Sequence, residues 1–185
     1  MTTSSIVLMS DRRVTAIPVQ ERGEVLLDAR AHGLMVDDRK QDAAGAWAHV
    51  RQGVLTRLQQ AQALLPGGVQ LLFIEGYRPP SLQRRYFEEY SDELARAHPD
   101  WQAAELREAA SRFVSPPEIA PHSAGAAVDV ISVRARTNRA TLGGALSTAG
   151  LINYGTDWWH WSFGDRYWAL QTQQPAALYG PVELP

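Results

Sequence analysis

An aspartate interrupts the apolar segment that runs from Ala126 to Val133. This segment has the length and the β-branched content of a strand, with Ala127, Asp129 and Ile131 on one face. A buried carboxylate is costly unless it is paired or binds a metal ion. The fold must therefore place either an arginine or a metal beside Asp129.

Two histidines can complete a metal site with Asp129. His122 stands seven residues earlier in PHSAGAAVD, and His160 lies in the segment TDWWHW. A His, Asp, His set has the number and type of protein ligands of a catalytic zinc with one open position. Gly125 and the alanines around it would let the backbone pass close to the ion. Two alternatives remain open, namely an arginine partner for Asp129 and an aromatic cluster that is only a corner of the core.

The segment TDWWHW places Asp157 and His160 three residues apart among three tryptophans. Indole rings exclude water, and a dry site strengthens each charge interaction inside it. On a regular strand the two side chains would face opposite sides, so a shared target requires a turn or bulge between them.

Composition narrows the classes of function. The chain of 185 residues has a formal charge of −2 and a pI near 6.2, which gives no general attraction to nucleic acid. It has no cysteine, so any metal must be held by histidine and carboxylate. The N-terminal residues lack the pattern of a secretory signal, and no run has membrane-spanning length. We therefore expect a cytoplasmic protein with neither nucleic-acid nor membrane partners.

The spacing of apolar residues predicts most of the regular elements. A long amphipathic helix is expected in 44–65, and a buried strand in 69–75. Three further helices are expected over 81–96, 100–113 and 138–150, and Asp100 is the expected cap of the second. Two strands are expected in 158–170, with a turn at Gly164-Asp165.

This order of elements predicts an α+β fold. We expect a single compact domain over residues 1–185, with a small, mostly antiparallel sheet, flanking helices and the zinc site on the sheet. His32, His49 and His98 lie in polar surroundings without an acidic residue at ligand spacing, and we interpret all three as solvated.

Several segments together resemble the zinc-dependent D-alanyl-D-alanine dipeptidases, the family that includes the vancomycin-resistance dipeptidase. The resemblance covers most of the chain and combines GYRP, HxxGxAxD and an acid two residues ahead of a WH pair. The matching segments are EGYRPPSLQRRYFEEY, HPDWQAAELREAASRFVSPP, PHSAGAAVDV and NRATLGGALSTAGLINYGTDWWHWSFGDRYWAL.

The resemblance implies one Zn²⁺ per chain, held by His122, Asp129 and His160. It places Asp157 at the position of the general base. It also places Arg78 at the arginine that steadies the developing oxyanion. A structural ion pair with Glu75 is the alternative for Arg78, and Glu75 could also orient the guanidinium. The residues expected to contact or support the substrate are Glu75, Tyr77, Ser123 and Trp159.

Three departures from the family pattern concern the substrate. The family usually has glutamate where this chain has Asp157, and often serine where it has Ala120. The family also carries, between the metal-binding strand and the following NR helix, an MGxxFD segment whose acid binds the substrate's free amino group. Here DVISVRARTNRA runs almost directly from strand to helix. We therefore expect the metal site to be kept while the substrate is longer, acylated or otherwise different.

The resulting hypothesis is a zinc metallopeptidase or amidohydrolase of peptidoglycan type that cleaves a small peptide or amide. One alternative is a zinc enzyme of specialised metabolism, in which Asp157 moves a proton on another small substrate. Another is a non-catalytic descendant that serves as a binding module.

Overall fold

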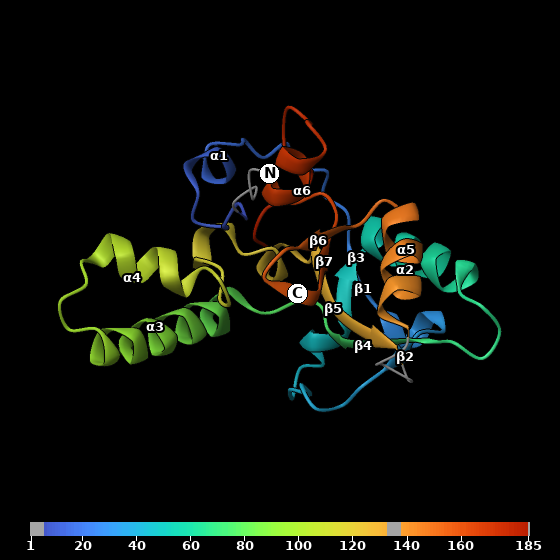
Figure 1. Cartoon of the computed structure of the whole chain (residues 1–185). Coiled ribbons are helices and arrows are strands. Elements are labelled where there is room, and N and C mark those ends of the chain that lie inside the picture. Colours follow the sequence, from blue (N-terminus) through green and yellow to red (C-terminus); the bar gives the residue numbers. More distant parts are fainter. Residues whose placement is uncertain (1–5, 133–137, 185) are drawn as a thin grey trace.

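A five-stranded sheet forms the centre of the molecule (Figure 1). The structure is a computed structural model and describes residues 6–132 and 138–184. The strands, in their order across the sheet, are β2 (Met35–Val36), β4 (Leu71–Glu75), β5 (Ala127–Ser132), β7 (Asp157–Ser162) and β6 (Ile152–Tyr154). Only β2 and β4 pair in parallel, and the other neighbours within this sheet are antiparallel. The expected α+β class with a mostly antiparallel sheet is confirmed.

A second, two-stranded sheet joins β1 (Leu26–Asp28) to β3 (His49–Arg51) in antiparallel pairing. The α-helices of the described residues are α1 (Arg12–Thr15), α2 (Gln52–Leu64), α3 (Pro80–Ala97), α4 (Ala103–Ala110), α5 (Arg139–Thr148) and α6 (Arg166–Gln171). Short 3₁₀ turns are η1 (Ala29–His32), η2 (Ala46–Ala48), η3 (Pro117–Ile119) and η4 (His122–Ala124).

Helices α2 and α5 lie side by side next to the sheet, and the α3–α4 hairpin projects away from it (Figure 1). The main hydrophobic core is shared by α2, α5 and the central strands, with Val54, Leu58, Phe73, Val128 and Leu146 among its buried residues.

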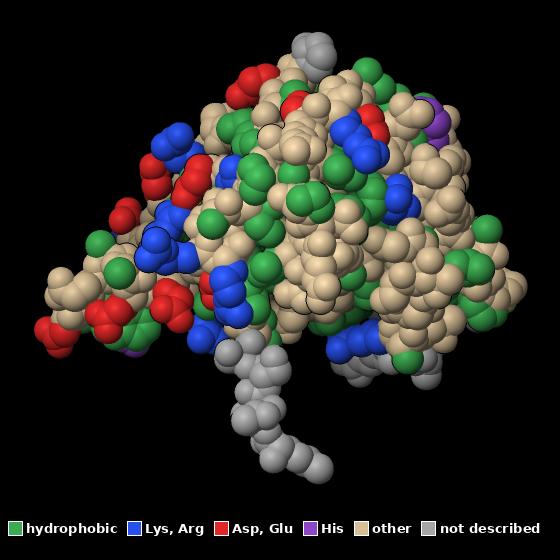
Figure 2. Space-filling model, turned by 90° about the horizontal axis from the view of Figure 1, so that it is seen from above, with side chains coloured by type: hydrophobic (Ala, Val, Ile, Leu, Met, Phe, Trp, Pro, Cys, Tyr) green, Lys and Arg blue, Asp and Glu red, His purple; other side chains and the backbone are tan. Residues whose placement is uncertain are grey.

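Within the described ranges, none of the helices has both the length and the apolar character needed to cross a membrane. Side chains of both charge signs are interspersed on the face shown in Figure 2.

The long helix predicted in 44–65 begins later than the sequence pattern indicates. Residues His49–Arg51 form β3 instead, because they pair with Leu26–Asp28. Arg51 is buried and donates to the carbonyl oxygens of Ala124, Glu24 and Gly180. His49, expected to be solvated, is half-buried with Nδ1 2.8 Å from the Gly45 carbonyl oxygen. Pairing between distant segments has overridden the helical pattern here.

Of the two strands predicted in 158–170, the first is confirmed as β7, but the second was wrong. The hairpin is formed by β6 and β7, which precede Gly164-Asp165, and residues 166–171 form α6. Asp165 caps this helix, because its carboxylate accepts a hydrogen bond from the Trp168 amide at 2.8 Å. The predicted strand 69–75 and the helices over 81–96 and 138–150 are confirmed as β4, α3 and α5.

The helix predicted over 100–113 is the shorter α4. Its cap is Gln102, which forms a reciprocal capping box with Glu105, so the prediction of Asp100 as cap was wrong. Val133, at the end of the expected strand, and the connection as far as Thr137 lie outside the described residues.

Candidate metal centre

Three acidic or imidazole side chains form a row across the central strands. Asp129 on β5 lies opposite Glu75 of β4 on one side and opposite His160 of β7 on the other. Residues directly opposite one another on neighbouring strands project from the same face of a sheet. The aspartate that interrupts the apolar strand therefore faces a histidine because of the register of β5 and β7.

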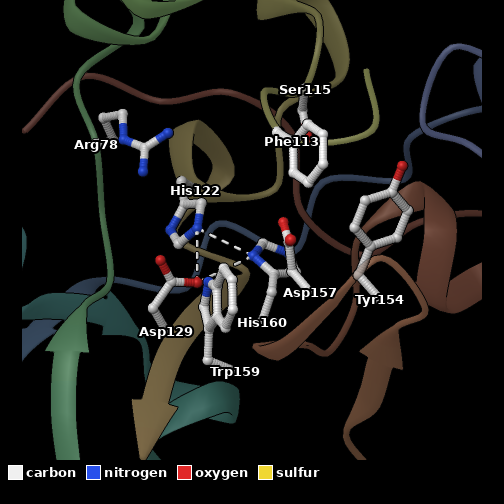
Figure 3. Close-up of a pocket in the computed structure, with 9 residues that line it drawn as sticks. All are labelled: Arg78, Phe113, Ser115, His122, Asp129, Tyr154, Asp157, Trp159 and His160. Atoms are coloured by element: carbon white, nitrogen blue, oxygen red, sulfur yellow. Dashed lines mark hydrogen bonds and ion pairs between the residues drawn. The ribbon is translucent and has the colours of Figure 1, made fainter. Parts of the chain in front are cut away.

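His122 approaches this row from the turn η4, and its side chain points toward Asp129 and His160 (Figure 3). His122 Nε2 lies 3.1 Å from His160 Nδ1 and 3.4 Å from Asp129 Oδ1, and His160 Nδ1 lies 3.2 Å from the same oxygen. Ligands of a tetrahedral zinc at 2.0–2.1 Å are about 3.3 Å apart. The triangle of donor atoms thus fits one zinc ion.

Hydrogen bonding supports the ligand role of His122. Its Nδ1 lies 2.6 Å from the Gly76 carbonyl oxygen and must carry the proton that this contact requires. In the neutral ring, Nε2 then presents a lone pair toward Asp129 and His160. A backbone partner of this kind is the usual way in which proteins fix the orientation of a metal-binding histidine.

The two loops beside the triangle are joined to each other. The Arg78 amide donates to the His122 carbonyl at 3.2 Å, and Ser123 Oγ donates to the Arg78 carbonyl at 3.0 Å. Tyr77 is buried, and its hydroxyl donates to the Val182 carbonyl at 2.7 Å. The described contacts of Tyr77 and Ser123 are thus to the backbone that supports the site.

Gly125 has a structural task in the turn that precedes β5. It ends η4 with φ +64°, and a Cβ at this position would meet Leu26 and the backbone nitrogen of Arg51. Glycine is therefore required by the turn and by the close approach of β1 and β3.

Asp157 begins β7 and lines the same cavity as the triangle (Figure 3). The register of β6 and β7 shifts between Asn153 and Tyr154. Because of this shift, the side chains of Asp157 and His160 can face the same cavity although they are three positions apart. The bend expected between Asp157 and His160 is confirmed. Burial raises the pKa of Asp157 to about 6; His160 opposes this rise and the Asp129 carboxylate adds to it. A buried carboxylate with such a pKa can exchange protons near neutral pH.

Burial disfavours ionisation of Asp129, but its contacts with His122 and His160 hold its pKa far below the ordinary value. This carboxylate is therefore ionised, as a metal ligand must be.

Arg78 forms a two-pronged ion pair with Glu75. Its Nε and Nη2 donate to the two carboxylate oxygens, each at 2.7 Å, and Nη1 donates to Gln83 Oε1 at 2.8 Å. Burial alone would raise the pKa of Glu75, but the guanidinium outweighs it and keeps this pKa below the ordinary value. Arg78 also lines the cavity, so its orientation is fixed by Glu75 and Gln83 while part of it faces the triangle.

The cavity has a volume of about 110 Å³. It is lined by Arg78, Phe113, Ser115, His122, Asp129, Tyr154, Asp157, Trp159 and His160. Phe113 and Trp159 are 60% and 38% exposed, so apolar rings stand at its mouth.

Sequence reasoning missed Phe113, Ser115 and Tyr154. Tyr154 lies three residues before Asp157 in the same motif-bearing segment, and a correct hairpin assignment would have found it. Phe113 and Ser115 come from the chain after α4, and no local pattern marks them.

Comparisons with known proteins place the fold among solved structures and find one curated relative. No protein-family profile matches the chain. The solved structure of the LD-carboxypeptidase LdcB covers 83% of this chain and 73% of its own, with a TM-score of 0.56 at 15% identity. A variant of the vancomycin-resistance D,D-pentapeptidase VanY, solved in complex with Zn(II), covers 75% of this chain and 84% of its own, with a TM-score of 0.49 at 20% identity.

The likeness to LdcB shows that the two chains share a fold. A curated relative has the activity that the sequence motifs suggested. A D-alanyl-D-alanine dipeptidase from Synechocystis sp. is 25% identical over 239 residues, which cover 91% of this chain and 96% of the relative. The resemblance seen in the sequence is thereby confirmed. Because the aligned length exceeds the 185 residues of this chain, the relative contains residues that have no counterpart here.

Proposed function

We propose that this protein is a zinc-dependent peptidase that hydrolyses an amide bond in a small, N-acylated peptide of D-alanyl type. The observation that carries the proposal is the triangle of His122, Asp129 and His160 donor atoms with the Asp157 carboxylate in the same cavity. The family resemblance supports the same chemistry. The described core, shared by the central sheet with α2 and α5, supports a single catalytic domain over residues 1–185.

His122, Asp129 and His160 would hold one Zn²⁺ per chain. When bound, zinc polarises the scissile carbonyl and lowers the pKa of the attacking water. Asp157 takes the proton of that water and passes it to the nitrogen of the leaving amine, for which a pKa raised toward neutrality is suited. The Arg78 guanidinium stabilises the negative charge that develops on the carbonyl oxygen, and Glu75 holds it in place.

The cavity supports an acylated substrate rather than a free dipeptide. Among its described lining residues, the acids are Asp129 and Asp157, and both are assigned to the metal and the proton transfer. This leaves no described carboxylate in the lining for a substrate's free amino group. Phe113 and Trp159 instead offer apolar surface at the mouth, where an acyl group would contact them.

Metal content and substrate preference test the proposal. Protein purified without added zinc is expected to contain about one zinc per chain by elemental analysis, and His122→Ala is expected to lose it. His98→Ala is the matched control, because His98 is exposed at the end of α3 and outside the triangle. The loaded protein is then incubated with D-alanyl-D-alanine and with its N-acetyl derivative, and we expect faster release of D-alanine from the acetylated compound.

The outcomes separate the alternatives. Equal zinc content in the wild type and His122→Ala would rule out the proposed metal site. It would also rule out the proposed zinc-dependent peptidase activity. Zinc binding without hydrolysis of either compound would favour a zinc enzyme with another substrate or a binding module. Faster turnover of the free dipeptide would show that another group binds the amino terminus, contrary to the proposed specificity.

A further inference from the structure

One amide side chain joins the proposed base to a proposed metal ligand. Asn153 Nδ2 donates to the carbonyl oxygen of Asp157 at 3.0 Å and to that of His160 at 2.9 Å. Asn153 is half-buried and lies in β6, next to the shift of register. Its side chain therefore spans the bend that brings Asp157 and His160 to one cavity.

The register explains why these carbonyl groups need a side-chain partner. Asn153 pairs with Trp161, whereas the next residue, Tyr154, pairs with Asp157. Three residues of β7, from Trp158 to His160, thus lie opposite no residue of β6. A bulge of this kind interrupts the ladder of backbone hydrogen bonds. The side-chain amide of Asn153 supplies hydrogen-bond donors to the carbonyl groups at the two ends of the bulge.

The identity of the side chain fits this task. Both partners are carbonyl oxygens, which only accept, so the nitrogen of the amide must face them. An amide nitrogen carries two hydrogens and can donate to both without introducing charge. An aspartate at this position has nearly the same shape but, when ionised, no donor.

The two ends of the bulge are held unequally. His160 and Trp161 also pair with Asp129 and Val128 of β5, and the pairing of β5 with β7 ends at His160. On this side the metal ligand is anchored without Asn153. The segment from Asp157 to Trp159 has no partner in β5, and Asp157 is held by its pairing with Tyr154 and by the side chain of Asn153.

We propose that Asn153 is a positioning residue that fixes the reach of the Asp157 carboxylate relative to the metal triangle. This inference rests on the proposed function, because it assigns Asp157 to proton transfer. Displacement of a reacting group by about 1 Å costs on the order of 100-fold in rate. Loss of the two hydrogen bonds should therefore lower kcat while the metal stays bound.

The test compares Asn153→Asp with Asn138→Asp. The second variant makes the same change before α5, where the Asn138 side chain forms no capping hydrogen bond. For Asn153→Asp, zinc content is expected to stay near one per chain, kcat on the N-acetylated substrate to fall about 10- to 100-fold, and KM to change less than about threefold. Asn138→Asp should match the wild type.

A second measurement uses the metal-free protein and does not depend on activity. Hydrogen exchange in Asn153→Asp should become faster at the amides of residues 157–159 and remain slow at 161 and 162, which pair with β5. A kcat within about threefold of the wild type, or unchanged exchange at 157–159, would overturn the inference. A wild type without hydrolytic activity would contradict the proposed function, and the exchange measurement would still decide whether Asn153 holds the bulge.

Discussion

At the scale of single residues, the Asp157 carboxylate is the group on which the proposed chemistry depends. It is buried, and within the described part of the chain its Oδ1 has no hydrogen-bond partner. A buried polar atom without a partner is rare in folded proteins and is often found where the group has a catalytic task. This oxygen is thus free to accept a proton from water in the cavity.

Asp157→Asn should retain zinc and lose most of its hydrolytic activity. The amide has nearly the same shape, but it cannot accept the proton of the attacking water, and such a loss costs about 10²- to 10⁴-fold. Steady-state kinetics on the N-acetylated peptide, with zinc content measured on the same sample, checks this. A rate within a few fold of the wild type would show that another group carries the proton.

The pH profile provides an independent check of the same assignment. Proton transfer to Asp157 requires the ionised form, so kcat/KM should fall as the pH drops through the pKa of this group. Burial raises this pKa from 3.8 to about 6 in the metal-free protein, whereas the positive charge of bound zinc lowers it. We expect the midpoint of the acid limb to lie between these two values, and we expect no such limb in the residual activity of Asp157→Asn.

At the scale of the elements, the spacing of apolar residues correctly predicted those helices and strands that depend mainly on their own sequence. The apolar spacing in α3 and α5 and the apolar run in β4 were sufficient to place these elements. The pattern failed at His49–Arg51, where pairing with β1 decides, and at 166–171, where the Asp165 cap starts a helix. Strand pairing across distant parts of the chain is not encoded in the periodicity of one segment.

The residues of the site divide in the same way, into those marked by a local motif and those whose role depends on strand pairing. His122, Asp129, His160 and Asp157 were candidates from the sequence, because chemical type and motif spacing single them out, and the structure brings them to one cavity. Asn153 was not singled out, because its task follows from a register shift that only the paired strands reveal.

Gly125→Ala should destabilise the protein by about 1–3 kcal/mol, because the turn requires φ +64° and the added methyl group meets Leu26. Gly144→Ala is the matched control. Gly144 lies in α5, and a methyl group added there would meet no atom within 4 Å beyond its own helix backbone, so alanine should stabilise the helix by up to about 1 kcal/mol. Urea denaturation of both variants measures the difference, and equal stabilities would contradict the role given to the turn.

At the scale of the whole molecule, the proposed zinc site connects three separate parts of the fold. His122 comes from η4, Asp129 from β5 and His160 from β7. An ion that binds all three in the folded state, and only weakly to the unfolded chain, stabilises the fold by mass action. The metal should therefore act on global stability as well as on catalysis.

Zinc is expected to raise the melting temperature of the wild-type protein. At a free concentration about 100 times the dissociation constant, the stabilisation is about 2.7 kcal/mol. For a chain of this size, that corresponds to an increase in Tm of roughly 5–10 °C. Scanning calorimetry of metal-free protein with and without zinc measures the shift. The same addition should leave the Tm of His122→Ala nearly unchanged, and an equal shift in both proteins would place zinc elsewhere.

The register of β5 and β7 also has a consequence for biosynthesis. Asp129 and His160 become neighbours only when the two strands pair, and α5 and β6 lie between them in the chain. During translation, His122 and Asp129 leave the ribosome well before their third partner. The nascent chain therefore lacks the complete set of proposed ligands until β7 has been added to the sheet, so a zinc ion could bind to all three only once β5 and β7 have paired.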